Sequence, residues 1–124
     1  MKQLANFIKI MPLSDYQAFD GTNMTGSSAP DLLLSENDLQ LQDEPSTTRA
    51  GILYEQSLKV ITGRLSDTTR KKYGNRRPVM ALVYDDLGTP CLWGDVNQKL
   101  YILITPGLHN DSISLFRKAT TPVL

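Results

Sequence analysis

One stretch of the chain, from Arg77 to Thr105, constrains the fold more than any other. Residues 78–84 form an apolar run that stops at the tip Asp85-Asp86-Leu87-Gly88, and apolar patterns resume over 91–95 and again over 98–105. Because the glycine of the tip can adopt positive φ without steric cost, the tip predicts a type I turn that closes a hairpin. The stretch therefore predicts a meander of three strands.

Four further segments have strand patterns. Leu4 to Met11 is an apolar run that a proline ends, and Ser112 to Lys118 alternates apolar with polar residues. Gly51 to Thr62 also alternates, which predicts that Ile52, Tyr54, Gln56, Leu58 and Val60 share one face and that the opposite face is mostly polar.

Asp31 to Gln42 allows strand pieces or a short helix. The alternation of Leu39 and Leu41 with polar residues favours strands. Residues 43–48 and 105–111 are rich in turn-forming residues and are expected to be loops.

These segments predict an all-β fold with six or seven short strands and at most one short helix. Short strands at close spacing favour an antiparallel β-sandwich or a partly open β-barrel. The 124 residues suffice for a hydrophobic core without metal or disulfide. We therefore expect a single β domain over residues 1–124.

A polar arm covers residues 14–30. It is rich in Gly, Ser, Thr, Asn and Asp, and Tyr16, Phe19 and Met24 are isolated apolar residues within it. No regular element is predicted there. Because loops of this length in compact domains are usually functional or disordered, we expect the arm to lie on its own domain or on a neighbouring subunit. Tyr16 and Phe19 are candidate interface residues.

A basic segment, residues 63–77, contains six of the thirteen Lys and Arg residues: Arg64, Arg70, Lys71, Lys72, Arg76 and Arg77. Within it, residues 66–74 predict one or two helical turns that Ser66 or Asp67 caps and Gly74 stops, or else a flexible hairpin tip. The cations suit a solvated loop, an acidic protein surface or a nucleic-acid backbone. Base stacking would need aromatic residues, and Tyr73 is the one aromatic in the segment.

Charge is balanced overall but uneven along the chain. The formal net charge is zero, which indicates neither a polyanion binder nor an unusually acidic protein. Residues 1–55 carry eight acidic and three basic residues, a net charge of −5, and the remainder carries +5. The acidic half of one copy is therefore a possible partner for the basic segment of another.

Residues that carry chemistry are sparse. One His and one Cys, His109 and Cys91, cannot form a structural zinc site, and no calcium or nucleotide-binding motif occurs. Asp85 and Asp86 fit turn capping better than acid–base catalysis. A small hydrolase built on His109 and Asp111 is the weakest hypothesis, since the sequence has no nucleophile elbow. We expect no cofactor and no enzymatic activity.

Other apolar residues suit a core and a soluble protein. Trp93, with Leu92, Tyr84 and Tyr101, is expected in the core, and the single cysteine is expected to be buried in a reducing compartment. The amino terminus lacks the pattern of a signal peptide. The longest apolar run elsewhere is far shorter than the roughly 20 residues of a spanning helix, so we expect a soluble protein made in the cytoplasm, without membrane partners.

Strand and turn patterns in the second half resemble a known kind of protein. The residues concerned are Tyr54-Glu-Gln-Ser-Leu-Lys-Val60, Arg77-Pro-Val-Met-Ala-Leu-Val-Tyr-Asp-Asp-Leu-Gly88, Leu92-Trp-Gly94, Ser112-Ile-Ser-Leu-Phe-Arg-Lys118 and Pro122. They resemble the small β-rich neck and tail structural proteins of tailed bacteriophages and prophages, of the head-tail connector or tail-completion type. The resemblance implies a virion protein, made in the bacterial host, that forms a ring and contacts portal, connector or tail proteins.

Two function hypotheses follow. The first is a non-enzymatic phage structural protein that assembles as a ring through the arm, the basic segment and the carboxy-terminal tail. The alternative is a small β-barrel binding module that contacts single-stranded nucleic acid through residues 64–77. Salt-dependent retention on an oligonucleotide would favour the alternative.

Overall fold

The computed structural model describes residues 4–48, 51–74, 77–94 and 99–119. The elements are β1 (Leu4–Pro12), β2 (Tyr16–Phe19), β3 (Met24–Gly26), β4 (Asp31–Leu34), β5 (Gln42–Thr48), β6 (Gly51–Gly63), α1 (Asp67–Tyr73), β7 (Arg77–Asp85), β8 (Pro90–Trp93), β9 (Leu100–Pro106) and β10 (Asn110–Ala119). The prediction of an all-β fold with at most one short helix is confirmed, but the described residues form ten strands instead of the six or seven expected.

Eight strands form one antiparallel sheet, in the order β4-β1-β7-β9-β10-β6-β5, with β8 beside β7. The predicted strands of the 77–105 stretch exist, but their arrangement as a simple meander is wrong. The short strand β8 pairs with residues 81–84 of β7, and β9 pairs with residues 77–79 of the same strand and with β10. A strand of nine residues is long enough to accept both neighbours along one edge.

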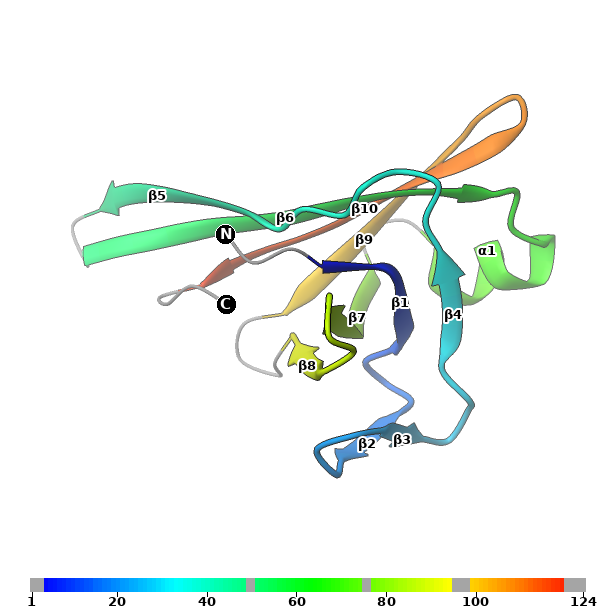
Figure 1. Ribbon diagram of the computed structural model, residues 1–124, viewed down its shortest axis with the longest axis horizontal. Coiled ribbons are helices and arrows are strands. Elements are labelled where there is room, and N and C mark those ends of the chain that lie inside the picture. Colours follow the sequence, from blue (N-terminus) through cyan, green and yellow to red (C-terminus); the bar gives the residue numbers. More distant parts are fainter. Residues whose placement is uncertain (1–3, 49–50, 75–76, 95–98, 120–124) are drawn as a thin grey trace.

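The chain after β4 closes the sheet toward β6. Glu36 donates its backbone N–H to the Ile61 carbonyl over 2.7 Å, and the Asn37 side chain bonds the Ile61 N–H and the Lys59 carbonyl at 2.9 and 3.1 Å. β5 pairs with the other half of β6, residues 51–57. The sheet therefore curls into a partly closed barrel (Figure 1).

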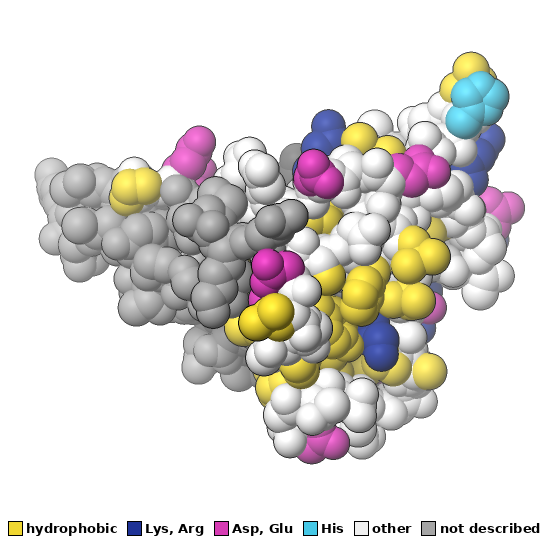
Figure 2. All heavy atoms as spheres, viewed as in Figure 1, with side chains coloured by type: hydrophobic (Ala, Val, Ile, Leu, Met, Phe, Trp, Pro, Cys, Tyr) yellow, Lys and Arg dark blue, Asp and Glu magenta, His cyan; other side chains and the backbone are white. Residues whose placement is uncertain are grey.

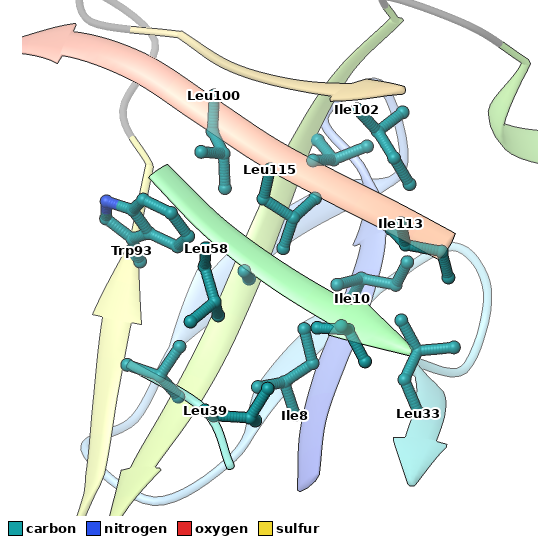
Figure 3. Packing of buried hydrophobic residues seen from close by; sticks show 14 of the residues in the cluster. Ile8, Ile10, Leu33, Leu39, Leu58, Trp93, Leu100, Ile102, Ile113 and Leu115 are labelled. Atoms are coloured by element: carbon teal, nitrogen blue, oxygen red, sulfur yellow. The ribbon is translucent and has the colours of Figure 1, made fainter. Parts of the chain in front are cut away.

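The main hydrophobic core lies inside this barrel. Figure 3 shows side chains from several strands pointing toward one another, among them Ile8, Leu58, Trp93, Leu100 and Leu115. Leu39 and Leu41 are also buried in this core although their segment is not a strand, so the strand prediction holds for 31–34 only. The predicted faces of β6 are confirmed for Gln56, Leu58 and Val60, which are buried, while the side chains of Ile52 and Tyr54 lie outside the described part of the structure.

A second apolar cluster lies on the outer side of β1 and β7. Side chains alternate along a strand. This cluster therefore contains Met80, Leu82 and Tyr84 of β7, while the alternate residues of β7, Val79, Ala81 and Val83, face the barrel interior. The β2–β3 hairpin covers the cluster with Met24, Tyr16 and Phe19. The arm therefore lies on its own domain, and the expectation that it has no regular element is wrong.

The tip of the β7–β8 hairpin matches its prediction. Gly88 has φ of 85° and donates its N–H to the Asp85 carbonyl over 3.0 Å. The Asp85 carboxylate accepts the N–H groups of Leu87 and Thr89 at 2.9 and 2.8 Å. Asp85 is thus a turn-capping residue, and Asp86 beside it is exposed.

One predicted loop is a strand. Residues 43–48 belong to β5, which pairs with β6 in continuous register from Gln42 to Thr48. The prediction failed because turn-forming residues such as Pro45 are compatible with an edge strand, where one side makes no ladder bonds. β5, the first half of β6 and the end of β10 form a ribbon that reaches beyond the barrel (Figure 1).

Candidate interaction surfaces

The basic segment folds into helix α1. The Ser66 hydroxyl accepts the Thr69 N–H over 3.2 Å, and Gly74, with φ of 60°, donates its N–H to the Arg70 carbonyl over 2.8 Å. These are the two signals that predicted the helix. The alternative of a flexible hairpin tip does not apply to residues 66–74.

Arg70 is bound inside the chain. Its guanidinium donates to both carboxylate oxygens of Asp111 at 2.8 to 3.0 Å, and the Leu65 N–H reaches the same carboxylate at 3.0 Å. Burial would raise the pKa of the Asp111 carboxyl, but these hydrogen bonds, the Arg70 charge and the Gly107 N–H together hold it below its ordinary value. The Asp111 side chain is fully buried, so this ion pair ties α1 to β10.

Lys72 and Tyr73 are also bound inside the chain. Lys72 Nζ lies 3.0 Å from an Asp31 carboxylate oxygen. The Tyr73 hydroxyl is buried within reach of the same carboxylate and of the Ile10 carbonyl, the latter at 3.0 Å. Burial, followed by the hydrogen bond to Asp31 and its charge, raises the pKa of Tyr73 well above its ordinary value. Tyr73 is therefore not available to stack on a nucleic-acid base.

The other candidate interface residues have different surroundings. Arg64, Lys71 and Arg77 are exposed, and Arg76 lies outside the described residues. Tyr16 and Phe19 are half-buried against the second cluster. The structure thus leaves three exposed cations around α1 and gives the two aromatic residues of the arm a packing role within the chain.

The residues of the hydrolase hypothesis are not assembled as a catalytic pair. His109 is exposed at the β9–β10 turn, while the Asp111 carboxylate is engaged by Arg70 and the Leu65 N–H. Cys91 is half-buried against the main core, less buried than expected, because its strand β8 is a short edge strand. Trp93 is fully buried, as predicted, whereas Tyr101, expected in the core with it, is half-buried on the outer face of the sheet.

A groove of about 490 Å³ lies on the outer face of β5, β6, β10 and β9, and we call it the aromatic groove. Phe116 of β10 pairs across the sheet with Ser57 of β6 and with Tyr101 of β9. The two rings form its apolar floor, with centroids 6.1 Å apart. Charged residues line one end: Glu44, Glu55, Lys99 and Lys118.

The charges of the aromatic groove are only weakly engaged with each other. Lys118 Nζ lies 3.6 Å from a Glu55 carboxylate oxygen, and both side chains are more than half exposed. An exposed ion pair of this kind contributes little, about 0 to 1 kcal/mol. The acids lie on β5 and β6 and the bases on or beside β9 and β10, so the groove is acidic on one side and basic on the other.

Buried polar contacts hold the base of the aromatic groove. The Gln56 side chain is fully buried, and its Oε1 accepts from Trp93 Nε1 at 3.4 Å and from Arg117 Nε at 2.5 Å. Arg117 is the cross-strand neighbour of Gln56 in β10. Hydrogen bonds of Gln56 to Trp93 and Arg117 therefore connect the strands beneath the groove to the barrel core.

A second exposed surface lies on β4, and we call it the β4 ridge. Leu32 and Leu34 are 52% and 63% exposed, while Leu33 between them faces the core. Their cross-strand neighbours on β1 are Lys9 and Phe7. Figure 2 shows hydrophobic side chains gathered over β1 and β4 with a basic side chain among them. An exposed apolar patch of this kind is typical of an interaction site.

Sequence reasoning missed both surfaces, although each has a signal. Three consecutive leucines, 32–34, cannot all face the core from one strand, so at least one must face away from it. Phe116 has the opposite phase to the buried Ile113 and Leu115, which places an aromatic ring on the outer face. The contribution of β5 to the groove has no such signal, because residues 43–48 are rich in turn-forming residues and so predict a loop.

Among the described residues, no group of three or more His, Cys, Asp or Glu side chains could hold a metal ion. A search of that same part of the chain finds no helix with the length and hydrophobicity to cross a membrane. Comparison with models of protein families, with curated proteins and with solved structures found no match to the chain.

Proposed function

We propose that this chain is a non-enzymatic structural subunit that assembles with copies of itself. The observation that carries the proposal is the pair of unlike exposed surfaces, the β4 ridge and the aromatic groove, on opposite edges of the strand order. Head-to-tail assembly requires two different surfaces on each subunit. An exposed apolar ridge and a groove with an aromatic floor supply such a pair.

The proposed setting is a tailed bacteriophage particle. The resemblance of the strand and turn patterns to phage neck and tail proteins supports a ring in the neck, head-tail connector or tail, with portal, connector or tail proteins as further partners. The ribbon of β5, β6 and β10 also supports assembly, because it reaches beyond the barrel (Figure 1).

The alternative function, nucleic-acid binding through residues 64–77, has less support from the geometry. Arg70 and Lys72 are paired with carboxylates, and Tyr73 is buried. Among the described residues of this segment, the cations that stay exposed are Arg64, Lys71 and Arg77, which provide charge but no stacking group. A sequence-independent phosphate contact is the form that this alternative would take.

The proposal is tested by mass measurement of the purified chain together with imaging of particles from a host that carries the gene. We expect a ring of defined stoichiometry in solution and the same protein in purified virions. A chain that stays monomeric at high concentration and is absent from virions would contradict the proposal.

A further inference from the structure

We infer that the β4 ridge of one copy docks into the aromatic groove of the next copy, and that this contact is the repeating interface of the assembly. The inference rests on the proposed function, since it names the surfaces through which the proposed subunits join. The occupant of the aromatic groove is therefore a second copy of this chain.

The first argument is the apolar character of the two surfaces. Four large hydrophobic residues are exposed in the described part of the chain, and two of them, Leu87 and Leu108, lie in turns between strands. The other two are neighbours on β4, held at a fixed spacing by pairing with β1. The aromatic groove offers the half-buried rings of Tyr101 and Phe116 as an apolar floor. Removing both from water favours association.

The second argument is charge. Lys9 lies beside Leu32 across the β4–β1 pairing, and the exposed Glu36 follows Leu34 in the chain. The ridge thus has a base beside Leu32 on β1 and an acid beyond Leu34 in the chain. The groove has Glu44 and Glu55 on one side and Lys99 and Lys118 on the other. The two surfaces are therefore complementary in charge. This complementarity favours one orientation of the ridge in the groove.

The third argument is geometry. β4 ends one edge of the strand order, and the groove includes β5 at the other edge. A contact between two different surfaces is heterologous, so it leaves a free ridge at one end of a pair of copies and a free groove at the other. Each copy can therefore add another, and the copies form a ring when the rotation between them closes.

Cysteine cross-linking tests the contact directly. In a Cys91→Ser background, Leu34→Cys places a thiol on the ridge and Ser57→Cys places one in the groove, next to Phe116 in the sheet. Both changes are small, and circular dichroism with thermal unfolding checks that each variant folds as the parent does.

A mixture of the two single variants should form covalent dimers under mild oxidation, whereas neither variant alone should. A chain with both cysteines should form a ladder of covalent multimers. As a matched control, Lys71→Cys on the exposed side of α1 should not cross-link with Leu34→Cys. Dimers from Leu34→Cys alone would overturn the inference, because they would show that two ridges meet.

An affinity measurement gives a second readout. Leu34→Asn should weaken self-association by about tenfold or more, as expected for an apolar anchor at the centre of an interface. Leu87→Asn, at the 87% exposed leucine of the hairpin tip, is the matched control and should leave self-association unchanged. Oligomers that persist without the predicted cross-link would overturn this interface but leave the proposed function standing, while a monomeric parent chain would overturn both.

Discussion

The α1 end of the barrel and the aromatic groove both combine charges with aromatic rings, yet they use them differently. At the α1 end, Arg70, Lys72 and Tyr73 are engaged by carboxylates of the same chain. In the groove, Phe116 and Tyr101 form the apolar floor, and Lys118 and Glu55 beside them form an exposed ion pair. Two cations of the basic segment, Arg70 and Lys72, therefore tie α1 to the barrel, whereas Arg64, Lys71 and Arg77 are exposed.

The largest effect expected from this difference is on stability. Arg70→Ala leaves the Asp111 carboxylate buried without its ionic partner, which should lower the free energy of unfolding by about 3 to 5 kcal/mol. Lys71→Ala, at the next residue of the same helix, is exposed and should change it by less than about 0.5 kcal/mol. Urea unfolding measures both. Equal effects of the two substitutions would contradict the structural role assigned to Arg70.

The next effect depends on pH. The pKa of Asp111 in the folded chain lies below its ordinary value of 3.8, so the unfolded chain binds the proton more readily. The ionised carboxylate therefore stabilises the fold above that ordinary value, and this contribution is lost as the pH falls through the lower folded pKa. The stability difference between the parent chain and Asp111→Asn should shrink as unfolding is measured from neutral to strongly acidic pH. A difference that is independent of pH would contradict the assignment.

A smaller effect is expected at Tyr73. Tyr73→Phe removes one buried hydroxyl while keeping the ring, and leaves Asp31 paired with Lys72, so it should cost about 1 to 2 kcal/mol. Tyr101→Phe in the groove is the matched control and should change stability by less than about 0.5 kcal/mol, because its ring is half-buried on the outer face. Thermal unfolding by differential scanning calorimetry checks both.

The smallest effect on stability is expected from the charges of the groove. Glu44→Ala and Lys99→Ala change exposed side chains and should alter the free energy of unfolding by less than about 0.5 kcal/mol each. Both should nevertheless weaken self-association, because they remove charge complementary to the ridge. Measuring the two quantities on the same samples sharpens the comparison, since the α1 variant Lys71→Ala should alter neither.

The sequence predicts the parts of this molecule that local chemistry determines. The tip at Gly88 and the helix after Ser66 follow from turn and capping residues, and the alternation in β6 predicts its buried face. β5 and the β2–β3 hairpin were missed because long-range pairing and packing, not local preference, stabilise them.

The candidate sites show the same division. The sequence shows where the cations are. It does not show that Arg70 contacts Asp111, which is 41 residues away in the chain but within 3 Å in space. The aromatic groove requires two pairs of strands in register. One pair is β5 and β6, the other is β9 and β10, and α1, β7 and β8 separate them in the chain. No local pattern contains that arrangement.

Sedimentation velocity of the parent chain, Leu34→Asn and Lys71→Ala at matched concentrations tests the central claim most directly. The account predicts one closed oligomer of more than two copies for the parent chain and for Lys71→Ala, and dissociation of Leu34→Asn. Dissociation of Lys71→Ala with an intact Leu34→Asn oligomer would place the interface at the α1 end and contradict the account.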